Sequence, residues 1–98
     1  MGALMGTEDR VARIHARLTE VLAPSALEII DDSHLHAGHA GAAGGGHYRV
    51  RIVSARFAGQ SPIERHRAVY QALGDLMGGA IHALALKTLT PAEVAARH

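Results

Sequence analysis

The stretch that decides the fold is His47–Glu64, HYRVRIVSARFAGQSPIE, because it combines a strand pattern with a strong helix start. Its first part alternates between apolar and polar side chains, as expected of a strand with one buried face. The inward residues would be Tyr48, Val50 and Ile52, and the outward residues His47, Arg49 and Arg51. A turn then leads to Ser61-Pro62-Ile63-Glu64, a capping box with proline at the first helical position. The stretch therefore predicts a strand over 47–54, followed by a helix.

On either side of this stretch, similar patterns place a helix and a strand before it, and a strand and a short helix after it. Thr7 is a suitable N-cap for a helix that Pro24 stops. Residues 27–33 and 81–88 are typical of strands, and Thr90-Pro91-Ala92-Glu93 repeats the capped helix start. We expect Gly78-Gly79 to end the second helix, whose inward stripe would be Ile63, Val69, Tyr70, Leu73, Leu76 and Met77.

The order of these elements is α-β-β-α-β-α, which indicates an α+β fold. Strands that follow each other directly should pair antiparallel, whereas the third strand, reached through a helix, should lie parallel to its neighbour. We therefore expect a three-stranded mixed sheet with helices on one face. A chain of 98 residues has room for one core, and we assign 7–95 to a single domain. Residues 1–6 are expected to be a disordered N-terminus, and 34–46, rich in His, Gly and Ala, a flexible loop.

The composition excludes several classes of function. The chain has no cysteine, so it forms no disulfide, offers no thiol nucleophile and cannot hold an iron–sulfur cluster with thiolates of its own. No apolar run approaches the roughly 20 residues of a membrane span, and the first residues do not resemble a secretory signal. We therefore expect a soluble cytoplasmic protein. A formal net charge of +1 does not indicate a nucleic-acid partner, and we recognise no catalytic motif.

The eight histidines are the unusual feature of the composition, because neutral imidazole is a ligand for zinc, iron, nickel and copper. His34, His36 and His39 lie in the Gly/Ala-rich loop, where they are either solvated side chains or ligands of an ion such as Zn²⁺. His82 opens the third strand, and strict alternation places it on the same face as the leucines that follow. It is either a core-edge histidine or a ligand that lies beside the loop.

Two further histidines have simpler interpretations. His47 begins the second strand on its outward face and is a minor ligand candidate. His66 lies between Ile63 and Tyr70 on the expected inward stripe of the second helix. We interpret His66 as structural, hydrogen-bonded to the sheet or to a loop carbonyl.

Three linked motifs resemble the BolA family. The run from His47 to Ser54, followed by Arg56-Phe57-Ala58-Gly59, resembles the family's strand that ends in Val-Ser before an Arg/Lys-Phe-x-Gly turn. Arg65-His66-Arg67-Ala68-Val69-Tyr70 resembles its helix motif, and Ile81-His82-Ala83-Leu84-Ala85-Leu86-Lys87-Thr88 resembles its third strand. The motifs follow the family's order at compatible spacing, and the likeness extends over nearly the whole chain.

The resemblance implies a class II KH-like fold and a non-enzymatic adaptor. BolA proteins partner monothiol glutaredoxins and share with them a [2Fe-2S] cluster, also held by the glutaredoxin cysteine and glutathione, in iron–sulfur cluster trafficking and iron homeostasis. The family's main histidine ligand maps onto His82. A second ligand comes from the loop between the first two strands, where His36 matches best and His34 and His39 are rivals. We expect no cofactor in the isolated chain, which should be a monomer or a weak homodimer.

The resemblance also implies an alternative, because some bacterial BolA proteins are described as DNA-binding regulators of transcription, stress response and morphology. The arginines that would form a modest basic patch for DNA are Arg49, Arg51, Arg56, Arg65 and Arg67. At a net charge of +1, solvated arginines are the plainer interpretation. Binding to duplex DNA that weakens steeply with salt would favour the alternative.

Overall fold

The structure is a computed structural model that describes residues 7–32 and 46–96. Its elements are helix α1 (Thr7–Leu22), strands β1 (Ala26–Asp31) and β2 (Gly46–Val53), helix α2 (Pro62–Leu73), strand β3 (Ile81–Leu89) and helix α3 (Pro91–Ala96). Short 3₁₀ turns η3 (Ala55–Phe57) and η4 (Gly74–Leu76) precede and follow α2. Gly46 belongs to β2, so the loop predicted over 34–46 is too long by that residue. The rest of that loop, like residues 1–6, lies outside the described residues. In the described ranges, no helix is long and apolar enough to cross a membrane.

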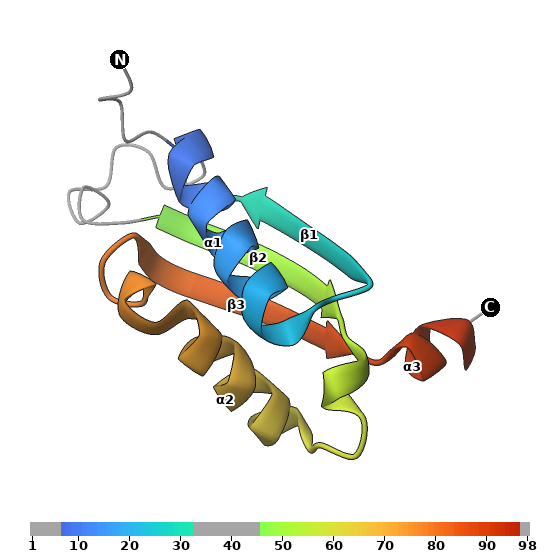
Figure 1. The fold of residues 1–98 in the computed structure, drawn as a ribbon. Helices are drawn as coiled ribbons and strands as arrows, with labels where there is room; N and C mark the ends of the chain where they lie inside the picture. The colour runs from blue at the N-terminus through green and yellow to red at the C-terminus, as the bar shows by residue number, and fades with distance from the viewer. Residues whose placement is uncertain (1–6, 33–45, 97–98) are drawn as a thin grey trace.

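The three strands form one mixed sheet in the order β1-β2-β3. β1 and β2 are antiparallel, with Ala26 opposite Val53 and Asp31 opposite Tyr48, and β2 and β3 are parallel. α1 and α2 lie across one face of the sheet, and α3 lies beyond the end of β3 (Figure 1). The predicted fold class, strand pairing and helix layer are therefore confirmed.

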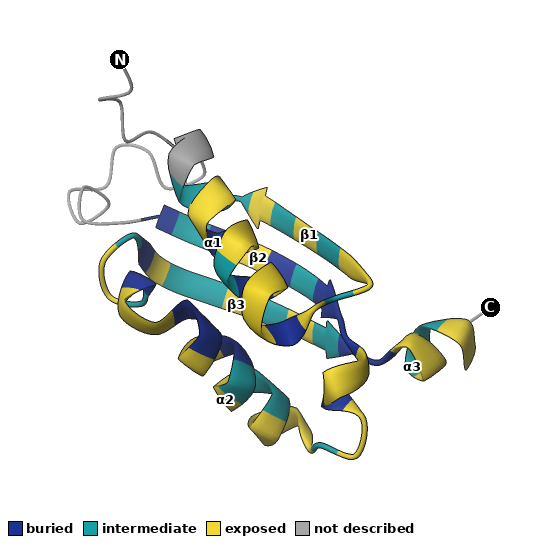
Figure 2. Ribbon diagram, in the orientation of Figure 1, coloured by how far each residue is buried: buried dark blue, intermediate teal, exposed yellow. Residues whose placement is uncertain are grey.

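The hydrophobic core lies between the helix layer and the inner face of the sheet. Ile14 and Leu18 of α1 and Phe57 of η3 are fully buried there. Burial alternates along β2 as the sequence predicts, with Val50 buried and Arg49 exposed (Figure 2). The opposite face of the same strand is therefore free to carry polar side chains.

Helix α2 begins as predicted and ends earlier than predicted. The Ser61 hydroxyl accepts a hydrogen bond from the Glu64 amide at 3.2 Å, and the Glu64 carboxylate accepts one from the Ser61 amide at 2.8 Å. The helix ends at Leu73, because Gly74 takes a φ of 53°, which favours glycine over residues with a side chain. Gly78-Gly79 therefore follows the helix without ending it.

The inward stripe of α2 also differs from the prediction. Val69, Ala72 and Leu73 are buried, but Ile63 and Tyr70 are 64% and 41% exposed. Ile63 and Tyr70 are seven positions apart, so they share one flank of the helix. That flank is rotated away from the direction in which Val69 and Leu73 meet the sheet. The prediction that Ile63 and Tyr70 face the sheet, which rests on their apolar character alone, is therefore wrong.

A buried serine closes the link between α1 and the end of β2. Ser54 is fully buried, and its hydroxyl donates to the Leu22 carbonyl at 2.6 Å and accepts from the Arg56 amide at 3.1 Å. The Arg56 guanidinium donates to the Val21 carbonyl at 2.7 Å. The last carbonyls of a helix have no N–H donors to pair with inside that helix. Ser54 and Arg56 satisfy two of them and so fix α1 on the sheet.

Arg65 joins α2 to β3 and α3. Its guanidinium donates to the Thr88 carbonyl at 3.3 Å and forms an ion pair with Glu93 at 2.8 Å. Thr90 and Glu93 form a second capping box, with reciprocal bonds of 2.8 and 3.1 Å. The Arg65 guanidinium and then the Thr90 amide lower the pKa of Glu93 to about 2. The interaction therefore helps to place α3.

Candidate functional site

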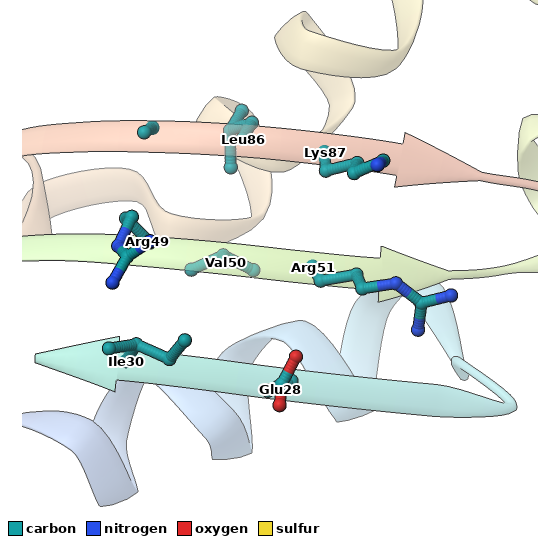
Figure 3. A pocket seen from close by; sticks show the side chains of 8 residues that line it. Glu28, Ile30, Arg49, Val50, Arg51, Leu86 and Lys87 are labelled. Atoms are coloured by element: carbon teal, nitrogen blue, oxygen red, sulfur yellow. The ribbon is translucent and has the colours of Figure 1, made fainter.

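No helix or strand of residues 7–32 and 46–96 covers the face of the sheet opposite α1 and α2 (Figure 1). Its middle contains a depression of about 220 Å³ lined by residues of all three strands. Figure 3 shows Arg49 and Arg51 on β2 between Ile30 and Glu28 of β1 and Lys87 of β3. This open face, defined by those residues, therefore carries both signs of charge together with exposed apolar surface.

A β-bulge interrupts the sheet where β2 and β3 begin. Gly46 is paired with Ile81, but the next residue of β2, His47, is paired with Ala83, so His82 is an extra residue on β3. Before this point the alternation of β3 is reversed, with Ile81 fully buried and His82 exposed. The prediction that His82 shares the inner face with the leucines of β3 is therefore wrong. Alternation predicts the face of a side chain only while the register is regular.

His47 and His82 form a pair of imidazoles at the end of the open face. Their ring centroids are 5.2 Å apart and their planes are inclined by 41°. His47 is half-buried and lines a second depression, of about 310 Å³, together with Asp32, Arg49 and Ala85. The Asp32 carboxylate accepts from Arg49 at 2.5 Å. The histidine pair thus lies beside an ion pair, on a surface that the helices do not cover.

The spacing of the two rings suits the binding of one metal ion. With metal–nitrogen bonds of about 2.0–2.1 Å and tetrahedral geometry, two imidazole ligands place their ring centroids about 5 Å apart. The described part of the chain contains no group of three or more His, Cys, Asp or Glu residues arranged to hold a metal. Two imidazoles are at most half of a four-ligand shell, so further ligands for a metal here must come from elsewhere.

The remaining predicted histidines are not part of this pair. His34, His36 and His39 lie outside the described residues, so their role as ligands stays a prediction. His66 is half-buried on α2, and its interpretation as a structural, hydrogen-bonded residue stays a prediction. Alternation indicates that His47 faces outward, but it does not indicate the bulge that brings His82 beside it.

The arginines proposed for DNA do not share one surface. Arg49 and Arg51 line the open face, whereas Arg65 and Arg67 belong to α2, which covers the other side of the sheet (Figure 1). Arg65 and Arg56 donate hydrogen bonds to carbonyls of the protein itself. Their guanidinium groups are therefore partly committed to holding the fold, and DNA binding through the five arginines stays a prediction.

Comparison with known proteins identifies one family. The BolA-like protein family matches residues 18–93. BolA-like protein 1 of Mus musculus is 45% identical over 82 residues, which cover 84% of this chain and 58% of that protein, so the chain spans little more than half of that relative. DNA-binding transcriptional regulator BolA of Vibrio cholerae is 40% identical over 80 residues, covering 82% of this chain and 74% of that protein. The solved BolA domain of SufE1 from Arabidopsis thaliana has a TM-score of 0.76 at 40% identity, covering 92% of this chain and 99% of that domain. This chain belongs to the BolA family.

Proposed function

We propose that this protein is a non-enzymatic adaptor that forms a complex with a monothiol glutaredoxin and shares a [2Fe-2S] cluster with it through histidine ligands. Its role would be cluster trafficking or iron homeostasis, in the cytoplasm, where reducing conditions keep the partner's thiols free. The observation that supports this proposal best is the exposed His82 ring, 5.2 Å from the His47 ring, on the open face of the sheet.

The number and kind of ligands favour a metal centre that is shared with a second protein over one that this chain holds alone. The chain has no thiolate, and two imidazoles do not complete the coordination of a cluster. A glutaredoxin cysteine and glutathione would supply the missing sulfur ligands. In Rieske centres two histidines replace two cysteines on one iron and raise the reduction potential. The contribution of this chain is to hold imidazoles on a face that a second protein can approach.

Reconstitution of the complex tests the proposal. We expect the wild-type protein and a monothiol glutaredoxin to give a mixed Cys/His cluster spectrum only when both are present, and His82→Ala to lose it. His66→Ala is the matched control, because His66 lies on α2 and not on the open face. An unchanged spectrum with His82→Ala would contradict the proposal.

The second ligand is tested in the same assay. The family resemblance favours His36, with His34 and His39 as rivals, whereas His47 is the histidine that lies beside His82 in the structure. Each of the four is replaced by alanine in turn. The histidine whose replacement changes the absorption and electron paramagnetic resonance spectra is the second ligand. If none of the four changes them, the chain contributes a single histidine to the cluster.

A DNA-binding regulator is the second candidate. It is supported by the name of the Vibrio cholerae relative and by Arg51 and Lys87, which are register partners on the open face. Glu28 opposes Arg51 across the sheet and disfavours a phosphate backbone there. The test is the affinity for duplex DNA at several salt concentrations. A steep slope, reduced by about one unit in Lys87→Ala, would support this candidate, and negligible binding would exclude it.

A further inference from the structure

The structure assigns to Gly46 the role of a positioning residue for the histidine pair, because its missing side chain leaves room for the Tyr48 ring at the β-bulge that turns His82 onto the open face. This inference deepens the proposed function and rests on it for the nature of the metal centre. The relative position of the two rings is a property of this chain alone and is measured without any metal.

The bulge decides which side chain of β3 enters the core. If the pairing of His47 with Ala83 continued backward without interruption, Gly46 would lie opposite His82. The His82 ring would then be on the inner face. In the structure Gly46 is instead opposite Ile81, which is fully buried and belongs to the hydrophobic core. The extra residue therefore places an apolar side chain inside and an imidazole outside.

Gly46 occupies a position with no room for a side chain. It is buried, and the ring of Tyr48 lies against it on the same face of β2. A methyl group at Gly46 would lie 2.5 Å from the Tyr48 hydroxyl oxygen and 2.6 Å from two ring carbons, which is closer than any normal contact. Tyr48 is only 2% exposed, so its ring cannot move aside without disturbing the core.

A shift at Gly46 would change the separation of the two imidazoles from both sides. His47 follows Gly46 directly, and the strand opposite is anchored to it because the Gly46 amide donates to the Ala80 carbonyl at 3.0 Å. His82 is the second residue after Ala80. Any side chain at position 46 must therefore displace either the Tyr48 ring or the point at which β2 and β3 join.

The chain offers a matched control in Gly79, which lies in the turn before β3. A methyl group there would meet its nearest atom, the Asp75 carbonyl oxygen, at 3.6 Å, an ordinary contact. Gly79 is also not among the glycines with positive φ. Gly79→Ala therefore makes the same chemical change close to the site and leaves the bulge intact.

The test compares the wild type, Gly46→Ala and Gly79→Ala by NMR of the histidine rings in the full chain. We expect a nuclear Overhauser effect between the His47 and His82 rings in the wild type and Gly79→Ala, and its loss in Gly46→Ala. Titration with Zn²⁺ as the probe, followed by the same ring signals, should show an affinity lower by about tenfold or more in Gly46→Ala. A folded Gly46→Ala variant with both properties unchanged would overturn the assignment.

A second variant covers the case in which Gly46→Ala does not fold. Gly46→Ala/Tyr48→Val removes the ring with which the methyl group collides, so it should fold and recover the effect between the two histidines. If it folds without that effect, the steric explanation is wrong. The outcome is separate from the proposed function, because an unchanged cluster spectrum with His82→Ala would refute cluster sharing and leave the ring measurements as they are.

Discussion

The buried serine at the end of β2 allows a quantitative prediction about stability. In Ser54→Ala the Leu22 carbonyl loses a 2.6 Å hydrogen bond in a buried site, and the Arg56 amide loses its acceptor. Leaving a buried carbonyl unsatisfied costs about 1–3 kcal/mol, and the lost hydrogen bond from the Arg56 amide contributes about 0.5–1.5 kcal/mol. We therefore expect the free energy of unfolding to fall by roughly 2–3 kcal/mol. For a domain of this size that corresponds to a melting temperature lower by roughly 10–20 °C.

Urea unfolding followed by circular dichroism measures this loss directly. The control is Ser25→Ala, which removes the same hydroxyl from an exposed serine whose bond to the Val53 carbonyl is 3.4 Å long. We expect the control to change stability by less than about 0.5 kcal/mol, as is usual for surface substitutions. The m-value should stay constant in both variants. If Ser54→Ala were no more destabilising than Ser25→Ala, the account of how α1 is held on the sheet would be wrong.

Two further predictions concern α3 and α2. Because the pKa of Glu93 is lowered to about 2, from an ordinary 4.5, its interaction with Arg65 should stabilise the fold fully above the ordinary value and be lost as the pH falls toward 2. At about pH 6 the wild type should therefore unfold at a higher urea concentration than Glu93→Gln, and this difference should shrink at about pH 3. An equal difference at the two pH values would disprove the prediction. On α2, Val69→Ala should cost about 2 kcal/mol and Ile63→Ser less than about 0.5 kcal/mol in the same urea assay, since only Val69 is buried. Equal losses would mean that Ile63 packs in the core after all.

Most of the fold could be predicted because it follows from local rules. The capping boxes at Ser61 and Thr90 are made within four residues, and the structure contains both. The alternation along β2 is equally local, and burial follows it. Strand pairing then follows from the type of connection, because a parallel pair needs a crossover and α2 provides one between β2 and β3.

The candidate site could be predicted only in part, because its geometry depends on the register between two strands. The family motif indicates His82 as a candidate ligand, but the pattern of β3 does not predict that its ring is exposed. Regular alternation puts His82 inside and Ile81 outside, and the structure shows the reverse. A bulge adds one residue to one strand of a pair, and the alternation of neither strand alone records that addition. The prediction of Tyr70 as a core residue is wrong for another reason, because the apolar residues of one helix do not by themselves show how that helix is rotated against the sheet.

The position of the two histidines at the bulge also indicates whether a metal centre there would be held by this chain alone or shared with a second protein. A structural zinc site surrounds its ion with four protein ligands and excludes solvent, whereas His47 and His82 lie at the end of a sheet face that no described helix or strand covers. A pair of ligands on such a face binds an ion weakly by itself, because it leaves half of the coordination shell to water. A second protein that brings sulfur ligands to this face would complete the shell and bury it in one step. Metal affinity and complex formation should therefore be linked, each strengthening the other by the same factor.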